Sequence, residues 1–120
     1  MTALGDAAIY LINFDGEAAL VDAGCGGAEK RLLQNIMDCG VQPERIEYLL
    51  ITHCHYDHTG GVQTVRERIH CQVVAHELEA VFLEQGDNIV TGVRWYGGTL
   101  RPFKVDRTIS GDSEKIIFGP

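Results

Sequence analysis

The sequence is poor in positive charge, with ten lysines and arginines against 17 aspartates and glutamates, a formal net charge of −7 over 120 residues. Concentrated positive charge draws proteins to nucleic acids without sequence preference and to anionic membranes. The charge balance therefore disfavours, without excluding, binding to a nucleic-acid partner without sequence preference or to an anionic membrane surface.

Long apolar runs and a secretion signal are also missing. No apolar run approaches the ~18 residues needed to span a bilayer. The opening residues, MTALGD, contain no basic region followed by an apolar stretch. We therefore expect no membrane partner and a cytoplasmic location. The four cysteines form no C-x-x-C pair, so reduced and mostly packed thiols are expected rather than disulfides.

A length of 120 residues predicts one domain, and 45% hydrophobic with 22% charged residues is ordinary for a globular protein. We find no internal repeat, low-complexity tract or linker. Hydrophobic periodicity and turn residues then predict the order of the elements. The expected elements are strands 8–14 and 17–22, helix 28–39, strand 46–51, helix 59–70, strand 71–75, helix 77–85, an irregular stretch 87–101, and strands 103–109 and 115–118. Strands alternating with helices predict an α/β layered fold.

The strongest chemical signal follows the apolar strand 46–51, where three of the five histidines and a carboxylate fall within six residues. The segment reads Thr52-His53-Cys54-His55-Tyr56-Asp57-His58-Thr59-Gly60-Gly61. In an extended segment residues i and i+2 point the same way, so His53 and His55 can approach one metal ion together. Imidazole suits zinc or iron, and Asp57 adds a harder oxygen ligand. Asp57 and His58 are aimed differently from the first pair, which invites a second metal. The alternative is a polar loop whose histidines bond to the backbone.

This segment resembles the signature of the metallo-β-lactamase-fold hydrolases, including the glyoxalase II-like enzymes. The upstream Leu20-Val21-Asp22-Ala23-Gly24 resembles the family's first motif, and its distance from the histidines is right for it. The resemblance covers residues 8 to about 118. It implies half of an αββα sandwich, a mixed β-sheet with helices packed on one face.

Carried over by position, the resemblance implies that His53 and His55 bind a first metal, and that Asp57 and His58 bind a second. Asp57 would also orient or deprotonate the attacking water. Asp22 would orient the site from behind the ligands, although on the residues alone a turn or helix-cap role is equally open. The implied cofactor is Zn²⁺ in a two-metal site, with Fe or Mn as alternatives. His at 55, where the family's diiron oxidoreductase branch tends to carry Glu, favours hydrolysis over redox chemistry.

The activity implied is metal-assisted hydrolysis, in which the metal lowers the pKa of water and polarises the scissile group. Small esters, thioesters or lactones are the expected substrates. Two alternatives stay open: an RNA- or DNA-processing nuclease of the same fold, and a non-catalytic metal-binding or interaction module.

The family also carries a third histidine for the first metal, a bridging aspartate and a last histidine, all in the second half of a longer domain. His70 and His76 come too early in the chain for these roles, so surface or capping roles are expected for both. Residues 1–120 are therefore expected to form a single, truncated domain, its amino-terminal half, with full activity needing the second half. An uncovered apolar sheet face would follow, and with it a homo-oligomer through that face or a longer parent protein.

Weaker signals lie around the motif. Cys54 should alternate away from the two flanking histidines and pack into the core. Tyr56 and the pair Trp95-Tyr96 either line a substrate pocket or plug the core beneath a loop. Arg94 and Arg101 are read as ordinary surface arginines.

Overall fold

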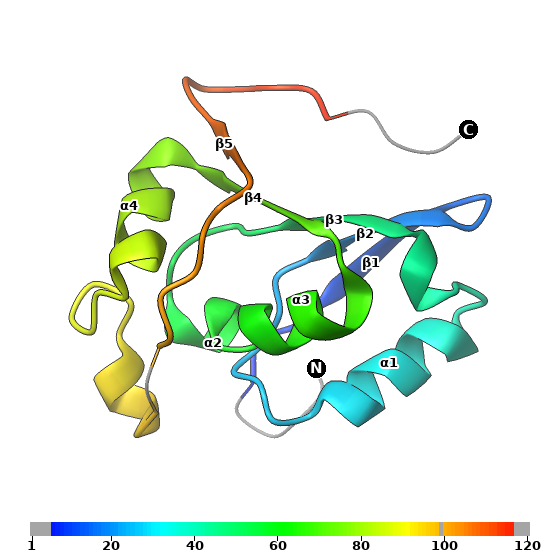
Figure 1. The fold of residues 1–120 in the computed structure, drawn as a ribbon, viewed down its shortest axis with the longest axis horizontal. Helices are drawn as coiled ribbons and strands as arrows, with labels where there is room; N and C mark the ends of the chain where they lie inside the picture. The colour runs from blue at the N-terminus through cyan, green and yellow to red at the C-terminus, as the bar shows by residue number, and fades with distance from the viewer. Residues whose placement is uncertain (1–5, 99, 117–120) are drawn as a thin grey trace.

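Five strands form one mixed sheet in the spatial order β1-β2-β3-β4-β5 (Figure 1). The computed structural model describes residues 6–98 and 100–116. Strand β1 pairs antiparallel with β2, and the pairs β2-β3, β3-β4 and β4-β5 are parallel. The strands are β1 (Tyr10–Phe14), β2 (Glu17–Val21), β3 (Ile46–Leu50), β4 (Gln72–His76) and β5 (Arg107–Ile109).

Helices connect the parallel strands, as an α/β fold requires. They are α1 (Glu29–Asp38), α2 (Tyr56–Thr59), α3 (Val62–Ile69) and α4 (Glu77–Gln85), with 3₁₀ turns η1 (Pro43–Arg45) and η2 (Val93–Tyr96). Among the described residues, no helix has both the length and the apolar character to cross a membrane. The predicted α/β class is confirmed.

Local signals in the sequence correctly placed several turns. Asp15 and Gly16 both adopt positive φ, at 51° and 88°, which is the backbone of the tight hairpin turn predicted between β1 and β2. Helix α1 ends before Gly40, whose φ of +81° only glycine adopts without strain. Helix α4 has the predicted bounds.

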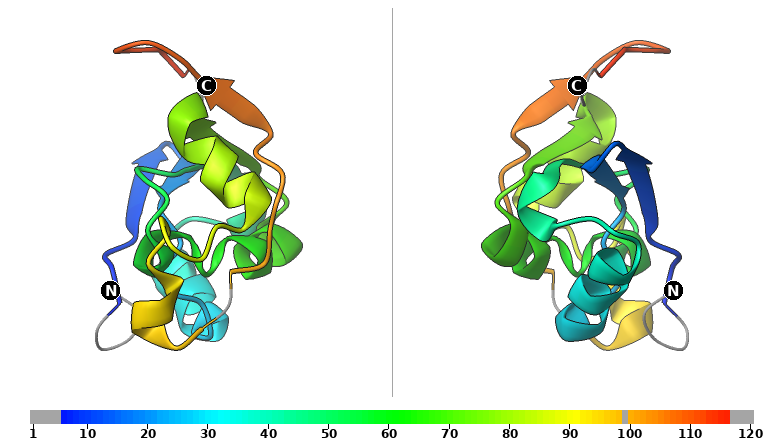
Figure 2. Two further views of the ribbon diagram at one scale, coloured as in Figure 1. Left: turned by 90° about the vertical axis from the view of Figure 1, so that its left-hand side faces the viewer. Right: turned by 90° about the vertical axis from the view of Figure 1, so that its right-hand side faces the viewer.

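The core lies on one face of the sheet. Alternate residues of the central strands, including Leu20, Leu49 and Val73, point to this face and belong to one buried cluster. Residues from α1, α3, α4 and η2 complete the same cluster, so the helices cover this face of the sheet as expected (Figure 2).

The opposite face carries apolar side chains that no helix covers. Tyr10, Ile12 and Phe14 alternate along β1 and are exposed, with Tyr10 at 64% and Phe14 at 56%. The strand registers place Val21 beside Tyr10, and Leu50 beside Val21, on the same face. Apolar side chains on this face are therefore exposed along β1, whereas Ala19 and Val74, on the same face, are buried.

Several predicted elements differ from the structure in their bounds. The helix predicted over 59–70 begins only at Val62, as α3, because Gly61 donates its N–H to the carbonyl oxygen of Gly24 at 2.9 Å, and Thr59 belongs to the separate helix α2. This diversion separates α2 from α3. The short helix α2 therefore contains Asp57 and His58.

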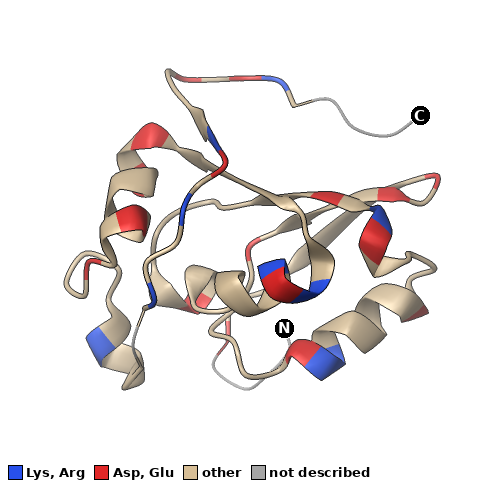
Figure 3. Cartoon of the chain, in the orientation of Figure 1, with Lys and Arg blue, Asp and Glu red and all other residues tan. Residues whose placement is uncertain are grey.

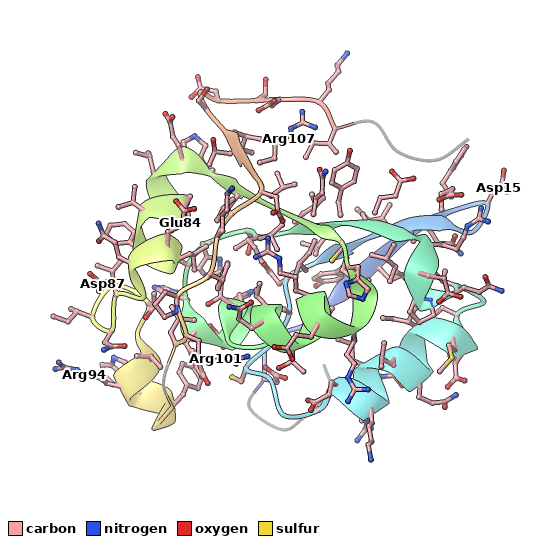
Figure 4. All side chains as sticks on the ribbon, in the orientation of Figure 1. Asp15, Glu84, Asp87, Arg94, Arg101 and Arg107 are labelled. Atoms are coloured by element: carbon pink, nitrogen blue, oxygen red, sulfur yellow. The ribbon has the colours of Figure 1, made fainter. Side chains whose placement is uncertain are left out.

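The strand predicted over 103–109 is reduced to β5. Phe103 and Val105 are alternately buried, which explains the prediction, but the N–H of Val105 donates to the Glu84 carboxylate of α4 at 3.1 Å (Figure 4). The strand predicted over 115–118 is absent at residues 115–116, and residues 117–118 lie outside the described part.

Candidate active site

The site lies at the carboxyl ends of two neighbouring parallel strands. Asp22 follows β2 and Thr52 follows β3, and because β2 and β3 run in parallel, the two residues meet at the same sheet edge. The N–H of Asp22 donates to the Leu50 carbonyl oxygen at 2.8 Å. Asp22 has a φ of +65°, an uncommon conformation for an aspartate, and this turn directs its carboxylate toward the residues after β3.

Asp22 is buried, with only 3% of its surface exposed, and its carboxylate accepts three hydrogen bonds. The Thr52 N–H donates to Oδ1 at 2.9 Å, and the Thr52 hydroxyl donates to Oδ2 at 2.7 Å. Nδ1 of His58 donates to the same Oδ2 at 2.7 Å. The predicted orienting role of Asp22 thus has its geometric counterpart.

This network assigns the protons on two histidines. The Thr52 hydroxyl spends its single hydrogen on Asp22, so its oxygen accepts from Nδ1 of His53, 2.9 Å away. His58 likewise carries its proton on Nδ1, facing the Asp22 carboxylate. In both imidazoles Nδ1 is therefore engaged in a hydrogen bond inside the protein, which leaves Nε2 as the nitrogen available to a metal.

The histidine rings gather into one cluster. The centroid of the His53 ring lies 4.8 Å from that of His55 and 4.1 Å from that of His58. Oδ2 of Asp57 lies 3.5 Å from Nε2 of His58, on the side of that ring away from Asp22. The structure brings the two predicted ligand pairs, His53/His55 and Asp57/His58, together around one cavity.

Close backbone packing supports the cluster from below. The loop after β2 bonds to the turn between α2 and α3, with the Ala23 N–H donating to the His58 carbonyl at 2.8 Å. A side chain on Gly61 would overlap the carbonyl oxygen of Ala23, and one on Gly60 would overlap that of Cys25. These contacts require glycine at both positions.

The four residues His53, His55, Asp57 and His58 line part of a cavity of about 430 Å³. The segment from Ile89 to Gly92, with Trp95 and Tyr96, forms the rest of the cavity wall. The volume suits a small-molecule ligand. Desolvation, together with the negative charge of Asp57 and a hydrogen bond to it, raises the pKa of Tyr96 above its ordinary value.

The donor atoms fit a transition metal in type, since imidazole nitrogens and a carboxylate suit zinc, iron and manganese. The Nδ1 hydrogen bonds of His53 and His58 are the kind of outer support that metal-binding histidines carry. In residues 6–98 and 100–116, however, no group of three His, Cys, Asp or Glu side chains is arranged to hold a metal ion. The ligand roles predicted for the four residues therefore stay predictions.

The other predicted residues lie mostly where expected. Cys54 is buried in the core, and His70 ends α3 in a left-handed conformation. Nδ1 of His76 accepts the Leu78 N–H at 3.2 Å, which is a capping role for α4. Tyr56 packs against Tyr96, with ring centroids 5.7 Å apart.

Two residues in contact with the motif were missed. The role of Thr52 depends on a partner 30 positions earlier in the chain. The Glu79 carboxylate of α4 accepts the Cys54 N–H at 3.2 Å, which ties the motif to that helix. Thr52 could have been suspected from its place beside the histidines, whereas nothing local singles out Glu79.

The chain is similar to known proteins over most of its length. The family model of the metallo-beta-lactamase superfamily matches residues 3–119. A crystal structure of the metallo-beta-lactamase GOB-18 from Elizabethkingia meningoseptica superimposes with a TM-score of 0.81 and 30% identity, covering 95% of this chain and 42% of that one. The chain belongs to the metallo-beta-lactamase superfamily.

Relatives at the sequence level include a probable metallo-hydrolase of Methanocaldococcus jannaschii, 31% identical over 81% of this chain and 46% of its own length. A ribonuclease Z of Streptomyces coelicolor is 31% identical over 72% of the chain and 27% of its own length. A hydroxyacylglutathione hydrolase of Anaeromyxobacter dehalogenans is 40% identical over 56% of the chain and 24% of its own length. The chain thus spans less than half the length of each of these relatives.

Proposed function

We propose that the chain carries the metal-binding half of a hydrolase that cleaves small esters, thioesters or lactones. The observation that carries this proposal is the network in which one buried carboxylate, Asp22, holds His58 directly and His53 through Thr52. In a polar loop whose histidines have no metal-binding role, no such network of hydrogen bonds is expected. Likeness to a hydroxyacylglutathione hydrolase supports the thioester class.

His53, His55, Asp57 and His58 are the residues that would hold zinc, or iron or manganese in its place. A bound divalent metal would lower the pKa of water and would polarise the scissile carbonyl group. The chain's own residues prepare for this chemistry. Asp22 and Thr52 keep the Nδ1 protons in place, and Asp57, on the cavity wall, would orient the attacking water or take its proton.

The metal content of the purified chain tests the proposal. The chain is purified without added metal, and zinc, iron and manganese are measured per chain for the wild type and for His53→Ala/His55→Ala. We expect metal in the wild type that is lost in the double variant. His70→Asn is the matched control, because His70 is exposed and its left-handed backbone suits asparagine.

Activity assays follow on acetyl and longer acyl thioesters and on lactones. Equal metal content in the wild type and the double variant, or hydrolysis that survives the double substitution, would refute the proposal. Because the chain spans less than half the length of these relatives, the assay also includes the chain with excess Zn²⁺.

A nuclease of the same fold is the second candidate, and the likeness to ribonuclease Z favours it. The net charge of −7 argues against it, and Figure 3 shows basic residues interspersed with acidic ones along the described ribbon. Tight RNA binding that weakens steeply with salt would favour the nuclease.

A non-catalytic metal-binding or interaction module is the third candidate. It is favoured by the absence, among the described residues, of three side chains placed to enclose one metal ion. Metal that exchanges within seconds, without hydrolysis of any tested ester, would favour the module.

A further inference from the structure

The part of the cavity wall formed by segment 89–96 exposes apolar side chains to water. Trp95 is 91% exposed, Ile89 is 74% exposed, and Val90 and Tyr96 are also exposed. All four line the same cavity as His53, His55, Asp57 and His58. Exposed apolar groups gathered on one wall of a cavity forfeit the free energy that burial would give them, which marks the wall as a binding surface.

The wall is held in place by hydrogen bonds and by buried anchors. The Asp87 carboxylate accepts the N–H groups of Ile89 and Val90, each at 2.8 Å. The Thr91 carbonyl accepts the Tyr56 N–H at 2.8 Å, and this hydrogen bond joins the segment to the first residue of α2. Thr91 and Val93 are buried. The exposure of the apolar side chains is therefore built into the turn.

The charges of the side chains that line the cavity indicate which ligands it can bind. The lining carries no lysine or arginine among the described residues, and its carboxylate, Asp57, is negative. Arg94, on the same segment, projects away from the body of the molecule (Figure 4). An anionic ligand group thus finds no side-chain counter-charge on this wall, whereas an uncharged apolar chain finds four apolar side chains.

We propose that the segment 89–96 binds an uncharged aliphatic or aromatic acyl group, with the ester or thioester carbonyl lying toward the histidines. This inference rests on the proposed hydrolase function for the placement of the carbonyl. The volume of about 430 Å³ accommodates an acyl chain of several carbons beside that carbonyl. The substrates are accordingly acyl compounds with an apolar tail rather than acetyl or phosphorylated ones.

The chain contains its own reporter, since Trp95 is the single tryptophan. The probes are two thioethers, S-octyl- and S-methyl-N-acetylcysteamine, which hydrolysis cannot cleave. We expect the octyl probe to shift Trp95 emission to shorter wavelength with a saturable dependence, and the methyl probe to cause no shift. Ile89→Ser and Val90→Ser should each weaken octyl binding by about tenfold or more, because each removes apolar contact.

Leu78→Ser is the matched control, because Leu78 is equally exposed, at 70%, but lies outside the cavity lining. The proposal is overturned if both probes act alike, or if Leu78→Ser weakens binding as much as Ile89→Ser. It is also overturned if the emission shifts with protein concentration and without probe, which would assign the wall to a second copy of the chain. The measurement needs neither metal nor catalysis, so its failure is separable from failure of the hydrolase proposal.

Discussion

Among single residues, Thr52 links the buried Asp22 carboxylate to His53 through two hydrogen bonds. Its hydroxyl donates to Asp22 and accepts from His53, so one side chain transmits orientation from β2 to the cavity. A hydroxyl group is needed for this, because a donor and an acceptor are used at once.

Replacing Thr52 by valine should remove the hydrogen bond that keeps the His53 proton on Nδ1, so the other tautomer of His53 should become populated. It should also weaken metal binding by about 10- to 100-fold, the usual effect of losing a residue that hydrogen-bonds to a metal ligand. Long-range ¹H–¹⁵N NMR of the metal-free chain reads the tautomer, and chelator competition reads the affinity. Thr52→Ser is the control and should behave as the wild type. An unchanged His53 tautomer in the valine variant would contradict the assigned network.

The cysteines differ in reactivity because they differ in burial. Burial raises the pKa of Cys71 to about 11, while burial followed by the Glu79 carboxylate raises that of Cys54 to about 12. Burial and Asp6 raise that of Cys25 to about 12. A raised pKa leaves less thiolate at a given pH, about one part in a thousand for Cys71 at pH 8. Cys39 is exposed.

A disulfide reagent at pH 8 should therefore modify Cys39 rapidly and the other thiols slowly, with their rates rising as the pH approaches 11. Absorbance of the released thiol counts the reacting groups over time. The denatured chain is the control and should show all four thiols at once. More than one fast thiol in the folded chain would show that the buried cysteines are accessible.

Between elements, the pair of glycines joining α2 to α3 lets two backbones touch beneath the histidines. Gly61→Ala should lower the free energy of unfolding by about 3 kcal/mol, because the new methyl group would overlap the Ala23 carbonyl in a packed region. Denaturant unfolding followed by circular dichroism measures this.

Gly27→Ala separates overlap from backbone strain. Gly27 has a φ of +84° and open space around its Cβ position, so its substitution should cost only the left-handed penalty of about 1 kcal/mol. An equal loss in the two variants would show that overlap at Gly61 is relieved by a backbone shift.

At the scale of the whole molecule, the apolar sheet face formed by Tyr10, Ile12 and Phe14 lies open beside the edge of β1. We predict that the 120-residue chain self-associates through this face, since a wide apolar patch on a sheet favours burial against another surface. Sedimentation velocity over a range of protein concentrations measures it.

Tyr10→Lys/Phe14→Lys should give a monomer, because the added charges oppose burial of the face. Ile89→Ser is the control and should leave the association unchanged, as Ile89 lies on the cavity wall. A wild-type chain that sediments as a monomer at every concentration, and that binds no apolar dye, would contradict the prediction.

The sequence predicted element types better than element ends. Periodicity found α1, α4 and the central strands because their apolar positions repeat within a few residues. It started α3 three residues early and missed α2, because the diversion of the Gly61 N–H depends on Gly24, far away in the chain. It extended β5 back to Phe103 because alternate burial resembles a strand, although Val105 bonds to a side chain of α4.

By itself, the sequence determined the α/β class, the superfamily and the four candidate ligands, because these are carried by local patterns: apolar periodicity and a motif of six residues. Only the tertiary structure decided that Asp22 reaches His53 through Thr52, that the four candidates line one cavity, and that the apolar segment 89–96 lines the same cavity. These are contacts between residues tens of positions apart. Such contacts arise from the pairing of β2 with β3 and the packing of the 87–96 segment on α2, which leave no trace in any single stretch of the sequence.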